Sequence, residues 1–249
     1  MASLPEITRD NFDAVLFDLD GVLTATAKLH AAAWKRTFDR FLKRRAEVRQ
    51  ETFVSFDIAE DYHQYVDGKT RFDGVQSFLT SRGIDLPYGA PTDLPDDETV
   101  CGISNEKNEL VNEIMANQGV EAYAGSVKAV EFLKQQGYKT AVVSSSENCA
   151  AVLEAAGIES LFEVRVDGRT AAELALPGKP APDMFLEAAR QMGVNPKRSI
   201  VVEDAIAGVR AGKSGGFGLV IGIARTGNAE ALNSEGADLV VEDLDELLP

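Results

Sequence analysis

Two pairs of acidic residues stand where apolar, strand-like segments end. Asp18 and Asp20 close the first such segment, and Glu203 and Asp204 close a later one. Side chains two apart on an extended chain point to the same side, and open α/β sheets bind ligands at the carboxyl ends of their strands. Neighbouring carboxylates repel each other unless a cation relieves them, and Mg²⁺ prefers such oxygen ligands. The pattern indicates a metal site, with solvated turn residues or acids at a helix amino terminus as the alternative.

A serine cluster and one lysine supply groups that suit a phosphate. Ser144, Ser145 and Ser146 lie between a strand-like and a helical segment, and hydroxyls and amides at such a turn form an anion cradle. Serines that cap a helix give the same pattern. Lys179 precedes a proline, which holds it in extended backbone, and a lysine fixed in this way suits the neutralisation of charge at an acceptor carboxylate. A solvated loop lysine is the alternative.

The elements that must position these residues form two groups. Strand-like apolar runs alternate with helical patterns at 127–136, 147–156 and 184–192, which predicts a parallel sheet covered on both faces. The predicted strands are 14–18, 140–144, 163–166, 199–203, 219–223 and 239–241. Between residues 28 and 115 helical periodicity dominates, as in the amphipathic stretch 28–46.

We therefore predict an α/β fold with a Rossmann-like, doubly wound parallel sheet as its core and an inserted α-helical cap domain. The core domain is predicted to be discontinuous, comprising residues 1–27 and 116–249, and the cap to comprise residues 28–115. A proline-containing acidic segment at 85–97 is predicted to be a surface loop of the cap.

The composition limits the partners and the compartment. A net charge of −15 over 249 residues works against binding to nucleic acid and to anionic membranes, although a cation and a few basic residues can still reverse the potential locally for an anionic substrate. No apolar run approaches the roughly 18 residues that span a bilayer, and no secretory signal is visible. Two cysteines suit a reducing compartment. We expect a cytoplasmic protein that binds a small molecule; its oligomeric state is not defined, and a monomer is compatible with the sequence.

Taken in order, these motifs resemble those of the haloacid dehalogenase superfamily. Residues 17–24 resemble its first motif, Ser144 its second, Lys179 its third and Glu203-Asp204 its fourth, so the resemblance covers nearly the whole chain. Dehalogenases lack an acid at the position of Asp20, which favours phosphoryl transfer over carbon–halogen chemistry.

The resemblance implies a role for each of these residues. Asp18 would attack phosphorus and form an aspartyl-phosphate, and Asp20 would act as general acid and base. Ser144 and Lys179 would hold the transferring phosphoryl group. The expected cofactor is Mg²⁺, held by Asp18, the backbone of Asp20, Glu203 and Asp204.

Residues 24–30 and Trp34 resemble one branch of this superfamily, the one that contains β-phosphoglucomutase and carries its cap after the first motif. That branch implies substrate contacts at Thr26, His30, Trp34, Gly68, Arg71, Lys107, Ser145, Ser146 and Asn148. The alternatives are a packed helix face for His30 and Trp34, which stand four residues apart, and a solvated helix position for Lys107.

Three positions depart from the mutase pattern. Ala25 stands where an aspartate is usual, and Asp67 and Glu147 stand where mutases typically carry lysines. Each unit-charge pair about 6 Å apart is worth roughly 3 kcal/mol at an effective dielectric constant near 20, so two anions in place of two cations weaken a second phosphate site. The sequence therefore favours a phosphatase acting on a small phosphorylated metabolite, with a sugar phosphate as the preferred class. The alternative is a β-phosphoglucomutase interconverting β-glucose 1-phosphate and glucose 6-phosphate.

A different class of protein shares some of these features. Response-regulator receivers also combine clustered acids, a phospho-accepting aspartate, a hydroxyl and a lysine on a parallel sheet, but they are much shorter and have no cap. A non-catalytic binding module would be expected to have lost Asp18 or Asp20, and both are present. An enzyme is therefore the preferred interpretation.

Overall fold

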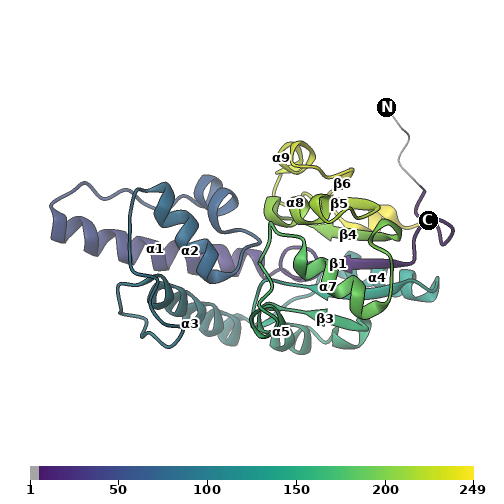
Figure 1. Ribbon diagram of the computed structural model, residues 1–249, viewed down its shortest axis with the longest axis horizontal. Coiled ribbons are helices and arrows are strands. Elements are labelled where there is room, and N and C mark those ends of the chain that lie inside the picture. The colour runs from purple at the N-terminus through teal and green to yellow at the C-terminus, as the bar shows by residue number, and fades with distance from the viewer. Residues whose placement is uncertain (1–5) are drawn as a thin grey trace. The chain divides into compact units, whose positions relative to one another are not determined.

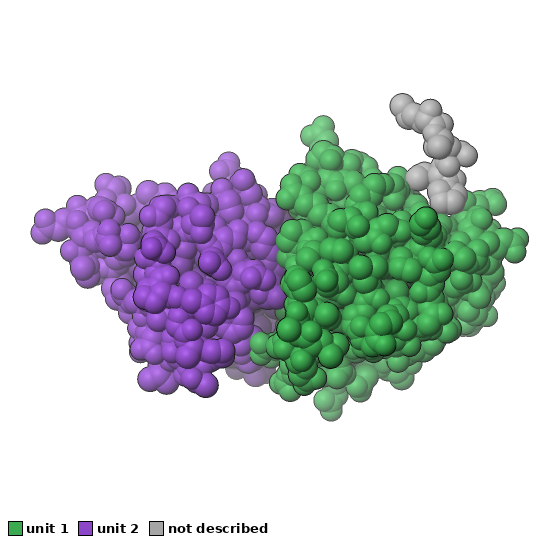
Figure 2. Space-filling model, in the orientation of Figure 1, with its two compact units in different colours: residues 1–26, 120–249 green, residues 27–119 purple. Residues whose placement is uncertain are grey.

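The computed structural model describes residues 6–249, and the chain divides into two compact units (Figures 1 and 2). The sheet unit contains the residues up to Thr26 together with Val120–Pro249, and the helical unit is Ala27–Gly119. The helical unit begins one residue before the predicted start of the cap at residue 28 and ends four residues after its predicted end at residue 115. The larger difference arises because the last helix of the helical unit continues to Gln118 and ends at Gly119, whose φ of 76° few other residues adopt.

Within the described residues, six parallel strands form one sheet in the order β3-β2-β1-β4-β5-β6. This arrangement confirms the predicted α/β fold, including the weakly signalled strand β3. The strands are β1 Ala14–Phe17, β2 Lys139–Val143, β3 Val164–Val166, β4 Ser199–Glu203, β5 Leu219–Ile223 and β6 Leu239–Val241.

Helices cover both faces of the sheet, as a doubly wound fold requires. They are α4 Ala124–Gln135, α5 Cys149–Ala155, α6 Gly168–Glu173, α7 Asp183–Met192, α8 Ile206–Ser214 and α9 Ala229–Ser234, with short 3₁₀ turns η2 Glu159–Leu161, η3 Pro196–Arg198 and η4 Leu244–Leu247. Because side chains alternate along a strand, Leu16 packs toward α7 and α8, whereas Val15 and Phe17 point toward α4 and η4.

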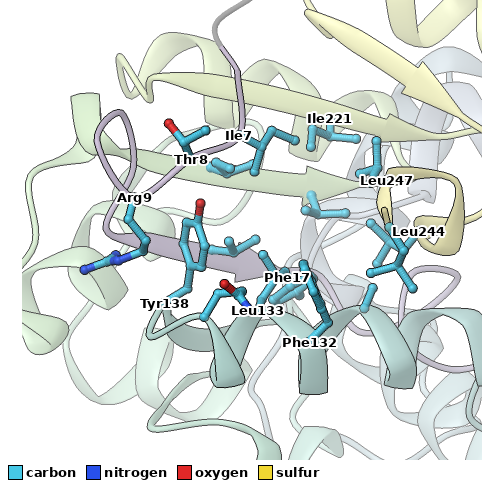
Figure 3. A pocket seen from close by; sticks show the side chains of 16 residues that line it. Ile7, Thr8, Arg9, Phe17, Phe132, Leu133, Tyr138, Ile221, Leu244 and Leu247 are labelled. Atoms are coloured by element: carbon cyan, nitrogen blue, oxygen red, sulfur yellow. The ribbon is translucent and has the colours of Figure 1, made fainter.

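The face under α4 and η4 contains an apolar cavity of about 290 Å³ (Figure 3). Phe17 and Ile221 of the sheet line it together with Phe132 and Leu133 of α4 and Leu244 of η4. No acidic side chain is among its lining residues, so this cavity is separate from the acids predicted to do chemistry.

The helical unit has its own aromatic core. Its elements are α1 Ala27–Arg49, the π-helical segment η1 Ile58–Val66, α2 Arg71–Ser81 and α3 Val100–Gln118. Phe38 lies at the centre of this core, with its ring 5.1 Å from that of Trp34, 5.1 Å from Phe56 and 4.2 Å from Phe78. The predicted surface loop at 85–97 contains no helix or strand. Among residues 6–249, no helix combines the length and apolar character needed to cross a membrane.

Candidate active site

The register of the three central strands brings the predicted functional residues to one edge of the sheet. Phe17 of β1 is level with Val142 of β2 and Val202 of β4. Asp18, the next residue along the chain, donates its N–H to the carbonyl of Val202 at 2.9 Å. The residues that directly follow these strands are therefore neighbours, although they come from distant parts of the sequence.

Lys179 joins two of these acids in the interior. Its ammonium lies 2.5 Å from Oδ1 of Asp18 and 2.6 Å from Oε1 of Glu203, and donates to the carbonyl of Val143 at 2.9 Å. These three acceptors use all three ammonium protons. Burial alone would lower the pKa of Lys179, but the charges and hydrogen bonds of Asp18 and Glu203 raise it above the usual range. Lys179 is therefore a buried cation, and the alternative of a solvated loop lysine is wrong.

Three carboxylates at this edge could hold a metal ion. One oxygen each of Asp18, Glu203 and Asp204 lies within 4.8 Å of the others. Burial raises the pKa of Asp18 well above its usual value, and the charge of Glu203 raises it further, while Lys179 opposes both effects. The single ammonium leaves the three acids with an excess of negative charge. A divalent cation would neutralise this excess and favour the ionised form of Asp18, so the donor set fits a hard metal ion.

Two glycines permit this close grouping of acids. A Cβ at Gly21, whose φ is +90°, would lie 1.8 Å from Oδ2 of Asp204. A Cβ at Gly208 would lie 1.8 Å from Oε1 of Glu203. Side chains at either position would push the acids away from the sheet edge.

Asp20 has surroundings different from those of Asp18. Its Oδ1 accepts a short hydrogen bond from the hydroxyl of Thr26, which also lies 2.8 Å from the hydroxyl of Thr24. The hydroxyl of Ser144 lies 3.4 Å from its Oδ2. The Asp20 side chain is outside the group of three carboxylates, so metal binding by its backbone stays a prediction.

The serine turn after β2 is shaped by its own hydrogen bonds. The N–H of Ser146 donates to the Ser144 hydroxyl at 3.2 Å, and the N–H of Asn148 donates to the Ser146 hydroxyl at 3.1 Å. Helix α5 begins at Cys149, two residues later than predicted, with Asn148 as its N-cap and without a side-chain cap. The N-cap residue of α5 is therefore Asn148 and not one of the serines, and the Ser146 hydroxyl binds the N–H of that residue.

In the helical unit, the structure brings together three of the predicted substrate-binding residues. The ammonium of Lys107 lies 3.0 Å from Nδ1 of His30 and 4.8 Å from the centre of the Trp34 ring. Lys107 is buried, with 6% of its surface exposed, so the alternative of a solvated helix lysine is wrong. Trp34 is part of the aromatic core of this unit.

The remaining predicted residues of this unit stand around the start of α2. Gly68 has a φ of 72°, and the guanidinium of Arg71, the first residue of α2, lies 4.3 Å from the centre of the Phe72 ring. Asp67, one of the departures from the mutase pattern, has its carboxylate 3.0 Å from Nδ1 of His63.

Two residues at the edge of the sheet were not singled out in the sequence. Arg225 follows β5 and donates to the carbonyl of Gly21 at 3.3 Å, and Asn228 donates to the carbonyl of Asp204 at 3.0 Å. Both come shortly after a buried apolar strand, as Asp18 and Ser144 do, and this shared position is the signal that could have identified them.

Comparison with known proteins identifies the family. A model of haloacid dehalogenase-like hydrolases matches residues 12–216. β-Phosphoglucomutases of Mycobacterium bovis and Mycobacterium tuberculosis are 50% identical to this chain over 98% of its length and 93% of theirs. The β-phosphoglucomutase of Bacillus subtilis is 30% identical over 94% of this chain and 91% of its own. The crystal structure of a Clostridium difficile β-phosphoglucomutase superposes with a TM-score of 0.71, at 26% identity, over 95% of this chain and 93% of that one.

The chain therefore belongs to the haloacid dehalogenase-like hydrolase family, as its four motifs predicted. It is an enzyme of the phosphohydrolase and phosphotransferase class. The two alternative interpretations, a response-regulator receiver and a non-catalytic binding module, are therefore wrong.

Proposed function

We propose that this enzyme is a Mg²⁺-dependent phosphomutase that interconverts β-glucose 1-phosphate and glucose 6-phosphate through an aspartyl-phosphate on Asp18. The observation that carries the phosphoryl-transfer chemistry is the difference between two carboxylates two residues apart. Asp18 is buried against Lys179, whereas Asp20 is held by the hydroxyl of Thr26 outside the metal-binding group. Two acids with distinct environments can take the distinct roles of nucleophile and proton donor.

In the first half-reaction, a carboxylate oxygen of Asp18 attacks phosphorus and the bond from phosphorus to the sugar oxygen breaks. Asp20 donates a proton to the departing oxygen, and Lys179 compensates charge on Asp18. In the second half-reaction, Asp20 takes the proton of a hydroxyl of β-glucose 1-phosphate, and that oxygen attacks the phosphoryl group, releases Asp18 and forms the glucose bisphosphate that is the donor in the first half-reaction. When bound between Asp18, Glu203 and Asp204, Mg²⁺ would neutralise charge on the phosphoryl oxygens.

The choice of a mutase is supported by the 50% identical relatives that carry this name, because their similarity covers almost the whole of both chains. This support reverses the order of preference that the sequence alone suggested. Asp67, which weakened the case for a second phosphate site, has its carboxylate engaged by the His63 ring, 3.0 Å from Nδ1.

A phosphatase is the second candidate, because Asp67 and Glu147 remain anionic positions where mutases typically carry lysines. It would use the same aspartyl-phosphate, with water in place of the sugar hydroxyl as the attacking group in the second half-reaction.

One experiment separates the two functions. The enzyme is incubated with β-glucose 1-phosphate, Mg²⁺ and a trace of the glucose bisphosphate, and both glucose 6-phosphate and inorganic phosphate are measured. Glucose 6-phosphate forming faster than phosphate is the expected result; the reverse order would establish the phosphatase. Asp18→Asn should abolish both products. Asp13→Asn is the matched control, because Asp13 stands at the other end of β1 and pairs with Arg198. Equal activity of the two variants would refute the role of Asp18.

A further inference from the structure

A largely buried arginine connects the loop after β1 to three other segments of the sheet unit. Nε of Arg225 donates to the carbonyl of Gly21 at 3.3 Å, and Nη2 donates to the hydroxyl of Ser126 at 2.9 Å. The Ser126 hydroxyl in turn donates to the carbonyl of Val22 at 2.6 Å. Nη1 forms an ion pair with Asp243. Two consecutive carbonyls of the loop are thus held, one directly and one through a serine.

The arginine is itself fixed in place. Its guanidinium lies 3.8 Å from the centre of the Tyr123 ring, and only 15% of its side chain is exposed. Burial alone would raise the pKa of Asp243, but the hydrogen bond and charge of Arg225 lower it below the usual value. A Cβ at Gly125 would lie 2.2 Å from Oδ1 of Asp243, so the absence of a side chain there lets this carboxylate approach. A planar cation between a fixed anion and an aromatic ring has little freedom to turn.

The loop that Arg225 holds sets the spacing of the acids. After Asp18 the chain folds back on itself, since the N–H of Gly21 donates to the carbonyl of Thr24 at 2.8 Å. Gly21 is also the point of close approach to Asp204. A shift of the Gly21 backbone would therefore move Asp20, the preceding residue, relative to Asp204.

The same arginine lies at the base of both connections to the helical unit. The N–H of Tyr123 donates to the carbonyl of Leu23 at 2.9 Å, and the N–H of Ala25 donates to the carbonyl of Glu121 at 2.9 Å. Thr24 and Ala122 form an antiparallel bridge between these bonds. The outgoing and returning segments are paired where Arg225 stacks on Tyr123.

From these contacts we propose that Arg225 is a positioning residue for phosphoryl transfer. By holding the carbonyls of Gly21 and, through Ser126, Val22, it fixes the loop that places Asp20 against Asp18 and the metal-binding acids. This inference rests on the proposed function, and it concerns a residue that does not touch the reacting atoms.

The test compares Arg225→Met with Arg198→Met. Arg198 forms a bidentate ion pair with Asp13 and donates to the carbonyls of Arg9 and Asp10, so it is a similar arginine network at the opposite ends of β1 and β4. We expect Arg225→Met to lower kcat by about 10- to 100-fold, to change KM for the sugar phosphate by less than about threefold and to raise the Mg²⁺ concentration for half-maximal activity. Arg198→Met should leave kcat, KM and the Mg²⁺ concentration for half-maximal activity within about twofold of the wild-type values, even if it lowers the Tm as much as Arg225→Met does.

Hydrogen exchange supplies a readout that does not depend on the reaction. The amides of residues 21–24 should exchange at least about tenfold faster in Arg225→Met than in Arg198→Met. Arg225→Lys, which can reach one carbonyl but cannot bridge the network, should restore part of both kcat and protection. If Arg225→Met does not fold, Ser126→Ala removes the bond to Val22 and the acceptor of Nη2 but keeps the bond from Arg225 to Gly21, and it should also lower kcat and loop protection.

The outcomes separate the two proposals. Unchanged loop exchange, or a kcat no lower than that of Arg198→Met, would overturn the positioning role of Arg225 even in a fully active enzyme. A wild-type protein that transfers no phosphoryl group would overturn the proposed function, and faster loop exchange in Arg225→Met would then still show that the arginine holds the loop.

Discussion

The buried contact between Lys179, Asp18 and Glu203 makes a quantitative prediction for Lys179→Met. Methionine keeps an unbranched apolar chain in the space of the lysine stem, whose ammonium lies 4.8 Å from the centre of the Phe185 ring, and removes only the charge and its hydrogen bonds. The substitution leaves two buried carboxylates without their cation.

The magnitude follows from burial. Both members of the Lys179–Glu203 pair are completely inaccessible to solvent and lie 2.6 Å apart, and Asp18 is almost as buried. Removing one partner of such a pair costs about 3–5 kcal/mol of stability, whereas an exposed pair contributes about 0–1 kcal/mol. We therefore expect Lys179→Met to lose about 3–5 kcal/mol near neutral pH in the absence of a divalent cation.

The loss should depend on pH with a definite sign. In the wild type, the raised pKa of Lys179 contributes stability that is constant below the unfolded value of about 10.4, so it does not vary between about pH 5 and pH 8. Burial and Glu203 raise the pKa of Asp18, and without Lys179 it rises further. A carboxyl group with a raised folded pKa loses stability as pH rises through that value. The deficit of the variant should therefore be smaller at about pH 5 than at about pH 8.

Urea unfolding in EDTA at about pH 5 and about pH 8 measures this difference. With an m-value of about 3 kcal/mol/M, the expected deficit at the higher pH is a midpoint shift of about 1 M or more. Arg198→Met, which removes a partly exposed pair, should shift the midpoint little and equally at both pH values. A deficit below about 1 kcal/mol for Lys179→Met, or one that does not change with pH, would refute the argument from buried charge.

Three further substitutions test other parts of the site and fold. Thr26→Val removes the hydroxyl that binds Asp20 and should lower kcat by about 10- to 100-fold in the mutase assay, while Thr26→Ser should keep most activity; equal rates for the two variants would contradict a role for this bond. Gly21→Ala places a Cβ against Asp204 at a φ of +90° and should weaken Mg²⁺ binding by about tenfold or more in calorimetric titrations, and unchanged affinity would argue against Asp204 as a ligand. Ala129→Ile extends into the cavity under α4 and should stabilise the protein by about 0.5–2 kcal/mol without changing kcat, as measured by thermal unfolding; a lower Tm would show that the cavity cannot accept the side chain.

The sheet could be predicted because its signal is local. Each strand is a short apolar run, and the residues that end β1, β2 and β4 must share an edge once those strands are neighbours. The order of the strands is not contained in their periodicity and was not predicted; the resemblance of the motifs implied only that Asp18, Glu203 and Asp204 meet at one metal ion. Given that order, the meeting of Asp18 with Glu203 and Asp204 follows from the geometry of a parallel sheet.

Contacts made by single side chains across long sequence separations were not predictable in the same way. Lys107 has the pattern of an exposed helix residue, yet it is buried against His30, 77 residues earlier. The network of Arg225 draws on four segments, and of these only the loop after β1 belongs to a motif that the sequence analysis singled out. The end of α3 could have been predicted from the sequence, because a glycine such as Gly119 after a helical stretch is a common signal for the end of a helix.

The pairing of Thr24 with Ala122 has a consequence for how such a protein can evolve. The chain leaves and re-enters the sheet unit at adjacent points, so residues 27–119 form an insertion whose two ends are already close together. Lengthening, replacing or removing this insertion therefore costs the sheet unit little loop-closure entropy. A chain in which a short glycine-rich linker joins Thr26 to Val120 should still unfold cooperatively in a urea titration, and a non-cooperative transition would show that the sheet unit needs the helical unit in order to fold. Residues 27–119 can then change in sequence while the acids of the sheet unit stay in place.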